Sequence, residues 1–173
     1  MWNKQDLMSK IERLDPRLRA AFAAACASRV LQKYIDWSRK INWGDGKQMS
    51  KALDLVWRFV EGEEISSDVL SVEAEIAYSL VPDSEDFPSA SSSGALDAGS
   101  TVVYALRCAI NGLPEHAVNA AEASFVAFDI VCHNDPSSTP ELPGKERTAQ
   151  NKTLEKLLTW GERPISRQDL IDI

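Results

Sequence analysis

The sequence lacks the features that mark several classes of protein. Its three cysteines, Cys26, Cys108 and Cys132, are far apart and form no Cys-x-x-Cys pair, so neither a disulfide framework nor a zinc ribbon is indicated. Glycine and proline contribute only 8 residues each to the 173, which argues against a low-complexity chain. The uncharged helical stretch 98–106 has nine residues, less than half of a membrane span, so we expect neither an anchor nor an export signal.

Basic residues are in the minority. The chain has 19 Lys+Arg against 26 Asp+Glu, for a formal net charge of -7. Binding to nucleic acid or to an anionic membrane needs clustered basic charge, so neither is expected as a partner. Hydrophobic residues make up 44% of the chain, which is enough for a continuous core. We therefore expect a soluble, cytoplasmic, globular protein.

Apolar residues recur at helical spacing along almost the whole chain. The helix near 69–80, for example, is indicated by Val69, Val72, Ile76 and Leu80. The pattern predicts seven helices and a last short turn around Ser166 and Asp169; the helices are 4–14, 16–40, 46–60, 69–80, 95–111, 114–133 and 145–160. We predict an all-α single-domain bundle of about seven helices over 1–173, with the apolar helix near 95–111 at its centre.

Two segments have the composition of loops. Residues 82–94 read PDSEDFPSASSSG and residues 133–144 read HNDPSSTPELPG, both rich in proline, serine and acidic residues. We expect both segments to connect helices, and we expect the second to be mobile.

Five short motifs occur in a fixed order along the first three quarters of the chain. They are WGDG at 43–46, ALDLVW at 52–57, PDSEDF at 82–87, ALDA at 95–98 and EHAV at 115–118. Together they resemble the bacterial domain-of-unknown-function family 416 (DUF416), over roughly residues 8–130. The resemblance implies an all-helical fold of bacterial origin, and it brings no activity, cofactor or catalytic residue. After His133 the chain departs from the family pattern.

The charge is distributed unevenly. Residues 1–40 carry nine Lys/Arg and four Asp/Glu, whereas residues 41–173 carry ten and twenty-two. Between Phe59 and Leu106 there are ten acids and no base. Such a stretch is either a solvated acidic face or a docking surface for a basic partner.

Three aspartates interrupt apolar helices and are candidates for chemistry. Asp54, Asp97 and Asp129 each have apolar neighbours, and a carboxylate in a core is costly unless it is paired or hydrogen-bonded. With His116 or His133 they could form a metal or acid/base site inside a bundle. Alternatively each aspartate caps a helix, bonds to the backbone or pairs with a base; the candidate bases are Arg29, Arg58 and Arg107.

Motifs of known catalytic chemistry are missing. The sequence has no GxSxG, P-loop, GxGxxG or HExxH motif and no paired Glu-x-x-His. The cysteines fall on apolar helix faces, where cysteine is usually an inert core residue. We therefore expect no catalytic residue, metal or cofactor, and structural roles for the three aspartates.

Four of the aromatic residues divide into two pairs according to their place in the predicted elements. Trp37 and Trp57 fit the apolar stripes of their helices and are expected in the core. Trp43 lies in a glycine-flanked turn and Phe87 in a polar loop, so each either plugs a helix junction or presents an anchor to a partner.

These observations favour a non-catalytic acidic module that binds a basic protein, such as an immunity-type inhibitor that neutralises a bacterial toxin. A signalling or regulatory adaptor would share most of these features, and a carboxylate-dependent metalloenzyme using Asp54, Asp97, Asp129 and a histidine is the third hypothesis. Homodimerisation through an apolar helix face stays open. The predicted contact residues are Glu61, Glu63, Glu64, Asp83, Glu85, Asp86 and Phe87.

Overall fold

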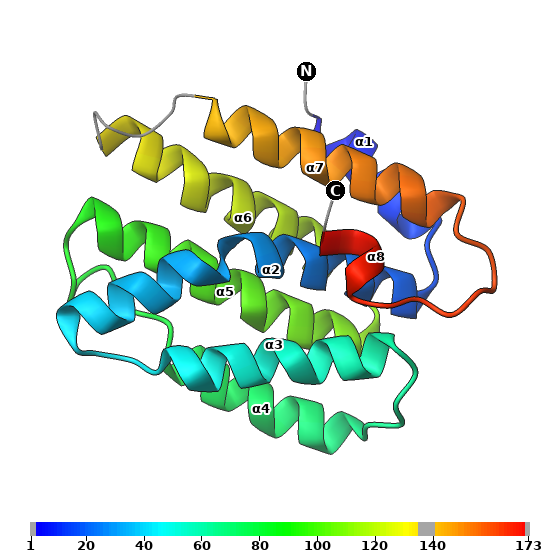
Figure 1. Ribbon diagram of the computed structural model, residues 1–173, viewed down its shortest axis with the longest axis horizontal. Helices are drawn as coiled ribbons and strands as arrows, with labels where there is room; N and C mark the ends of the chain where they lie inside the picture. The colour runs from blue at the N-terminus through cyan, green and yellow to red at the C-terminus, as the bar shows by residue number, and fades with distance from the viewer. Residues whose placement is uncertain (1–2, 135–140, 172–173) are drawn as a thin grey trace.

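The computed structural model describes residues 3–134 and 141–171, which form eight helices and no strand (Figure 1). The helices are α1 (Lys4–Glu12), α2 (Pro16–Ile41), α3 (Gly46–Val60), α4 (Ser67–Ser79), α5 (Ala90–Asn111), α6 (Pro114–Asn134), α7 (Leu142–Leu158) and α8 (Gln168–Ile171). The all-α prediction is confirmed, and the short α8 is the last turn that the sequence indicated.

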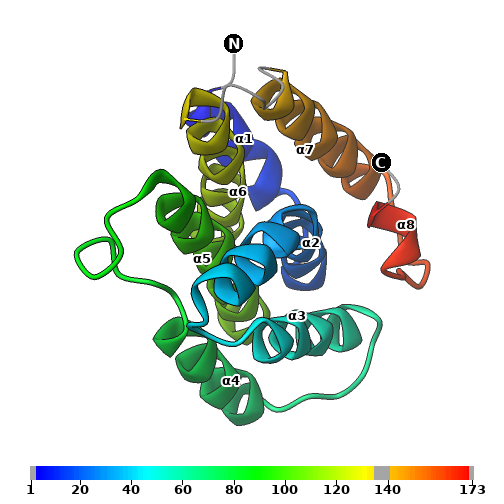
Figure 2. The same cartoon turned by 60° about the vertical axis from the view of Figure 1, so that its left-hand side comes forward.

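Helices α2 and α5 lie at the centre of the bundle. They pack against each other and against α6 and α3, as Figures 1 and 2 show. On α2, Phe22, Cys26, Val30 and Tyr34 recur every four residues and are completely buried. Every residue from Ala20 to Ala27 is buried as well, and these mostly small side chains let the neighbouring helices approach closely. The central position predicted for the apolar helix is confirmed.

Local capping interactions set several helix boundaries. The Asp15 carboxylate accepts the Leu18 N–H at 2.9 Å and begins α2, with Pro16 at the first helical position. At the end of α5, Gly112 takes φ +67°, and a Cβ atom there would lie 2.6 Å from the Cβ of Pro16. Both the left-handed conformation and the close approach therefore require glycine.

The first predicted loop is shorter than the sequence indicated, because α5 begins at Ala90 and not at residue 95. The Ser89 hydroxyl caps the new helix start by accepting the Ser92 N–H at 3.2 Å. The Ser92 side chain is buried, and its hydroxyl accepts the indole N–H of Trp37 at 3.0 Å. The composition of this segment predicted a loop, but a tertiary hydrogen bond from α2 holds Ser92 in the helix.

The second predicted loop is shorter as well, since α6 extends to Asn134 and α7 begins at Leu142. Residues 135–140, and with them the predicted mobility, lie outside the described residues. Helix α4 forms an outer layer that packs mainly on α3 and α5 (Figure 2). In the described part of the chain, no helix is long and apolar enough to cross a membrane.

Candidate functional site

The predicted acidic contact residues lie at the two ends of α4. Glu61, Glu63 and Glu64 follow α3 in the turn that leads into α4, whereas residues 83–87 lie in the loop between α4 and α5. Helix α4 has 13 residues, and at 1.5 Å per residue it separates the two groups by roughly 20 Å. The predicted contact set is therefore two acidic clusters, one in each of the two segments that flank α4 in the ribbon of Figures 1 and 2.

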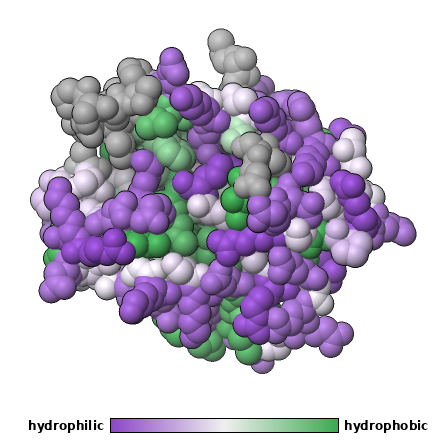
Figure 3. Space-filling model, in the orientation of Figure 1, coloured by the Kyte–Doolittle hydropathy of each residue, from purple (hydrophilic) through white to green (hydrophobic). Residues whose placement is uncertain are grey.

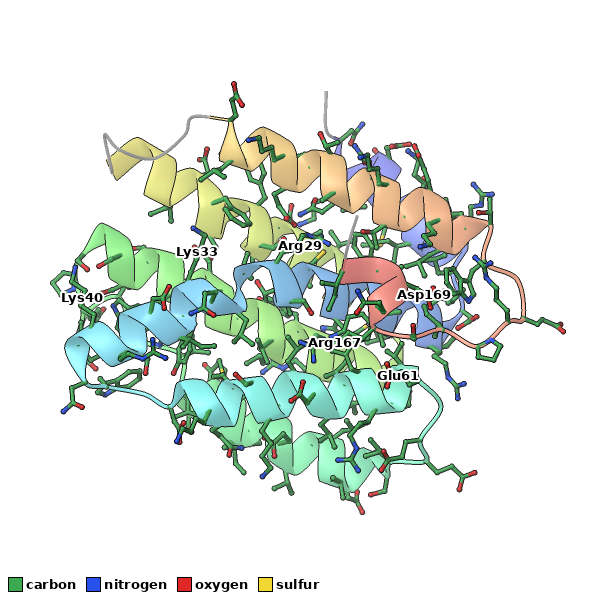
Figure 4. All side chains as sticks on the ribbon, in the orientation of Figure 1. Arg29, Lys33, Lys40, Glu61, Arg167 and Asp169 are labelled. Atoms are coloured by element: carbon green, nitrogen blue, oxygen red, sulfur yellow. The ribbon has the colours of Figure 1, made fainter. Side chains whose placement is uncertain are left out.

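At the N-terminal end of α4, two of the three glutamates already have partners within the chain. A carboxylate oxygen of Glu61 accepts the backbone N–H of Arg167 at 2.9 Å, and Figure 4 shows these two residues near the start of α8. Glu63 accepts the Arg58 Nε–H at 2.6 Å, and this hydrogen bond lowers the pKa of Glu63 below its ordinary value. Glu64 is exposed. Of the three, Glu64 is the most available to a partner.

At the other end of α4, the loop carries two fully available acids. The Asp83 carboxylate accepts the Glu85 N–H at 2.8 Å, which stabilises the turn. Glu85 and Asp86 are both exposed. Their carboxylates can face an approaching basic surface without breaking this turn.

Phe87, the last predicted contact residue, belongs to an aromatic cluster that joins the loop to α2. Its ring lies 5.5 Å from the ring of Trp37 and 4.9 Å from that of Trp43, and the two tryptophan rings are 5.7 Å apart. Phe87 and Trp43 are half-buried. Both aromatics therefore pack at the helix junction, the first of the two roles considered from the sequence. Trp37 and Trp57 are buried, as predicted.

Between the two acidic clusters, α4 turns apolar side chains outward. Val69, Val72 and Ile76 are 51%, 62% and 40% exposed. The inner face is made instead of residues one step along the helix, among them Leu70 and Ala77. Three of the four residues whose spacing indicated this helix thus face outward, and the fourth, Leu80, is half-buried against the core. We call Val69, Val72 and Ile76 the α4 stripe; no contact role was predicted for them from the sequence.

The three interrupting aspartates do not form one site. Asp54 is exposed on α3 and pairs with Arg167 at 2.6 Å, whereas Asp97 and Asp129 are half-buried on α5 and α6. In the described part of the chain, no three histidine, cysteine or acidic side chains are placed to hold a metal ion. His116 contacts Asn111 at 3.3 Å in the first turn of α6, and the His133 side chain lies outside what the structure describes.

Pairing with a base is confirmed for Asp54, although its partner is Arg167 and none of the three arginines named from the sequence. Arg58 pairs with Glu63, and the Arg107 guanidinium lies 5.7 Å from the ring centre of Tyr78. Asp97 is half-buried, and burial raises its pKa to about 6. The remaining candidate, Arg29, belongs to a cluster that the sequence analysis did not identify.

This cluster is a buried polar network between α2, α6 and α7. Arg29 donates to both carboxylate oxygens of Glu146, at 2.7 and 3.1 Å. The same carboxylate accepts hydrogen bonds from the Ser124 hydroxyl at 2.9 Å and from the Gln150 amide at 2.8 Å. A signal was present, because Leu157 and Leu154 extend backwards at helical spacing to Gln150 and Glu146. The many charged residues elsewhere on α7 made this buried face hard to recognise in the sequence.

The cysteines have the inert role expected of them where the structure describes their side chains. Cys26 and Cys108 are completely buried, and burial raises the pKa of both thiols to about 12. Both therefore stay protonated at neutral pH. The side chain of Cys132 lies outside the described residues.

Two surface hollows could admit small molecules. One, of about 510 Å³, lies beside the turn from α2 to α3 and includes Arg39, Asn42 and Lys47. The other, of about 600 Å³, lies along α7 and includes Lys145 and Lys152. The first offers amide, hydroxyl and basic side chains and the second hydroxyl and basic side chains; each lining also has one carboxylate, and neither has histidine or cysteine. The acidic surface around α4 is the more distinctive feature.

Comparison with known proteins agrees with this fold. The family model described as "Protein of unknown function (DUF416)" matches residues 6–156, continuing past His133, where we expected the chain to leave the family pattern. The chain is similar to the crystal structure of a DUF416 family protein from Shewanella baltica OS155, with a TM-score of 0.73 and 21% identity over 95% of this chain and 89% of that chain. At this identity the likeness shows the fold. No curated protein matches the chain.

Proposed function

The chain belongs to the DUF416 family of proteins of unknown function, and we propose that it is a non-catalytic module that docks a basic protein on the surface around α4. The observation that carries this proposal is the 48-residue stretch 59–106, which has ten acids and no base and which includes the whole of α4 with its flanking loops. We define the acidic edge as its exposed acids other than Glu61, whose carboxylate already accepts the Arg167 N–H: Glu63, Glu64, Asp68, Glu75, Asp83, Glu85 and Asp86.

Electrostatic complementarity supports a basic partner. Unneutralised charge of one sign steers a partner of the opposite sign and orients it during association. On the neighbouring helices, Arg58 offsets the charge of Glu63, one acid of the edge, and the Arg107 guanidinium lies 5.7 Å from the ring centre of Tyr78. Lys47 and Lys51 are exposed on α3, yet the seven acids of the edge outnumber them. The edge therefore keeps a net negative charge.

The finer form of the proposal is an immunity-type inhibitor of a basic bacterial toxin. Carboxylates can take the positions at which a cationic nuclease binds the phosphate groups of nucleic acid. The acidic edge supplies several carboxylates in one region. A signalling or regulatory adaptor would use the same surface, so the identity of the partner separates the two. The carboxylate enzyme loses support, because Asp54 is exposed and paired with Arg167, and because in the described part of the chain no three histidine, cysteine or acidic side chains are placed to hold a metal ion.

The test is capture of partners from host lysate by the tagged full-length chain at low and at high salt, followed by mass spectrometry. The variant Glu64→Lys/Glu85→Lys/Asp86→Lys reverses three exposed acids of the edge. The matched control, with the same change in charge, reverses three exposed acids elsewhere: Glu12→Lys/Glu155→Lys/Glu162→Lys.

We expect one stoichiometric basic protein, retained by the wild type and the control at low salt and lost from the edge variant. A gene for a toxin directly beside that of this chain, encoding the captured protein, would support the immunity-type form. Equal retention by both variants, or no captured protein, would overturn the docking proposal.

A further inference from the structure

We propose that the α4 stripe is the contact core for a basic amphipathic helix of the partner protein, with the acidic edge as its charged rim. This inference rests on the proposed docking function and adds the shape and chemistry of the element that docks. Figure 3 shows hydrophobic surface along the lower edge of the molecule, where α4 lies.

The stripe has the geometry of a helix-packing ridge. Val69, Val72 and Ile76 follow spacings of three and four, which place them within one narrow strip along α4. Their large exposed fractions contrast with Leu70 on the inner face, which is 1% exposed. A row of this kind fits the groove of a second helix, whose own apolar side chains recur at the same spacing.

The charges around the stripe determine the chemistry of the occupant. Asp68 and Glu75 are exposed on α4 beside the stripe, and the two acidic clusters lie beyond its ends. A docked helix would meet apolar side chains along its middle and carboxylates at its margins. Interfaces commonly have this arrangement of an apolar core and a polar rim. Lysine or arginine at the margins of the docked helix would pair with the carboxylates of this rim.

A second copy of this chain fits the surface poorly. Packing α4 against α4 of another copy would bring Asp68 and Glu75 of both copies together, with no basic residue on either helix to offset them. Like charges brought together across an interface oppose association. The stripe therefore favours a basic partner over the packing of α4 against α4 of a second copy.

The test uses a synthetic peptide with leucines at positions i, i+3, i+4 and i+7 and lysines elsewhere, designed to form a basic amphipathic helix. A scrambled peptide of the same composition keeps the charge and removes the apolar face. Affinities for the full-length chain are measured by calorimetry, and the contact surface is mapped by amide chemical shifts. Sedimentation of the chain alone reports self-association.

The stripe variant is Val69→Ser/Val72→Ser/Ile76→Ser. Its matched control changes three exposed apolar residues elsewhere, Ile41→Ser/Leu113→Ser/Val126→Ser, which are 37%, 48% and 37% exposed. Thermal melts verify that both variants stay folded, which we expect because all six side chains are exposed.

We expect the stripe variant and the scrambled peptide each to weaken binding by about tenfold or more, while the control variant changes it by less than about twofold. Equal binding of the two peptides, an unaffected stripe variant, or dimerisation through α4 would overturn the inference. Failure of the docking function itself would look different. In that case the lysate would yield no basic partner, whereas failure of this inference alone would leave a partner captured through the acidic edge.

Discussion

Two ion pairs join the C-terminal part of the chain to its first helices, and they differ sharply in burial. Arg29 and Glu146 link α2 to α7 at 2.7 Å, with side chains 14% and 1% exposed. Arg167 and Asp54 link the start of α8 to α3 at 2.6 Å, with side chains 41% and 58% exposed. The distances are nearly equal, so the difference in energy comes from the surroundings. Removing one partner of the buried pair leaves the other charge buried and uncompensated. At the exposed pair, water solvates the charge that remains.

The largest effect is expected from removing the buried carboxylate. Glu146→Ala leaves Arg29 buried without a counter-ion, and it removes an acceptor from Ser124 and Gln150. We expect the free energy of unfolding to fall by about 3–5 kcal/mol. Urea denaturation followed by circular dichroism measures the change. Glu155→Ala, at an exposed position on the same helix, is the control and should stay near the wild type.

A double variant sharpens this prediction. Arg29→Met with Glu146→Leu replaces both charges by apolar side chains of similar size, so that neither charge is left alone. We expect it to lose less than half of the stability lost by Glu146→Ala. A double variant as unstable as the single one would mean that the hydrogen bonds of the network, and not the isolated charge, carry the effect.

Asp97 represents a third situation, a half-buried acid whose environment disfavours its charged form. Because burial raises its folded-state pKa from 3.8 to about 6, the folded state holds this proton more tightly than the unfolded chain. The resulting stabilisation is complete below pH 3.8 and is lost as the pH rises through 6.

We therefore expect Asp97→Asn to be more stable than the wild type at pH 7.5, by about 1 kcal/mol once solvent access to this carboxylate is allowed for. The difference in free energy of unfolding between the variant and the wild type should grow as the pH rises from 4 toward 6.5. Urea titrations at several pH values measure it. A difference that is independent of pH would contradict the assignment to Asp97.

The smallest effect is expected at the exposed pair. Asp54→Ala removes the partner of Arg167, which keeps its backbone hydrogen bond to Glu61 and access to water. We expect a loss of about 0.5 kcal/mol or less, shrinking further as salt is added. The melting temperature at low and at high salt measures it. A loss comparable to that of Glu146→Ala would show that the contact between α8 and α3 holds much more than one surface ion pair.

The sequence predicted the helices well because their signals are local. Caps such as Asp15 and Gly112, and apolar residues at spacings of three and four, act within one or two turns of the chain. The prediction failed where a distant segment decided the outcome. Ser92 is helical and buried because its hydroxyl meets the Trp37 indole, 55 positions away in the chain.

The candidate site shows the same division. The stretch without bases, and hence the acidic character of this region, could be read directly from the sequence. The separation of the predicted contact acids into two clusters could not be predicted, because only the path of the folded chain places the two clusters at opposite ends of α4. The exposure of the α4 stripe could not be predicted either, since a valine at helical spacing can face the core or the solvent. Two neighbouring helices, α3 and α5, cover one side of α4 and leave the other uncovered.

By itself the sequence determined an all-helical chain, most helix boundaries, the inert burial of Cys26 and Cys108 and an acidic segment, because each of these depends on composition or on neighbours within a few residues. The tertiary structure alone decided which charges are paired and which apolar residues are covered. Arg29 and Glu146 are 117 positions apart, and Asp54 and Arg167 are 113 apart. No local pattern specifies such pairs, because the helices meet only when packing of the whole core brings them together.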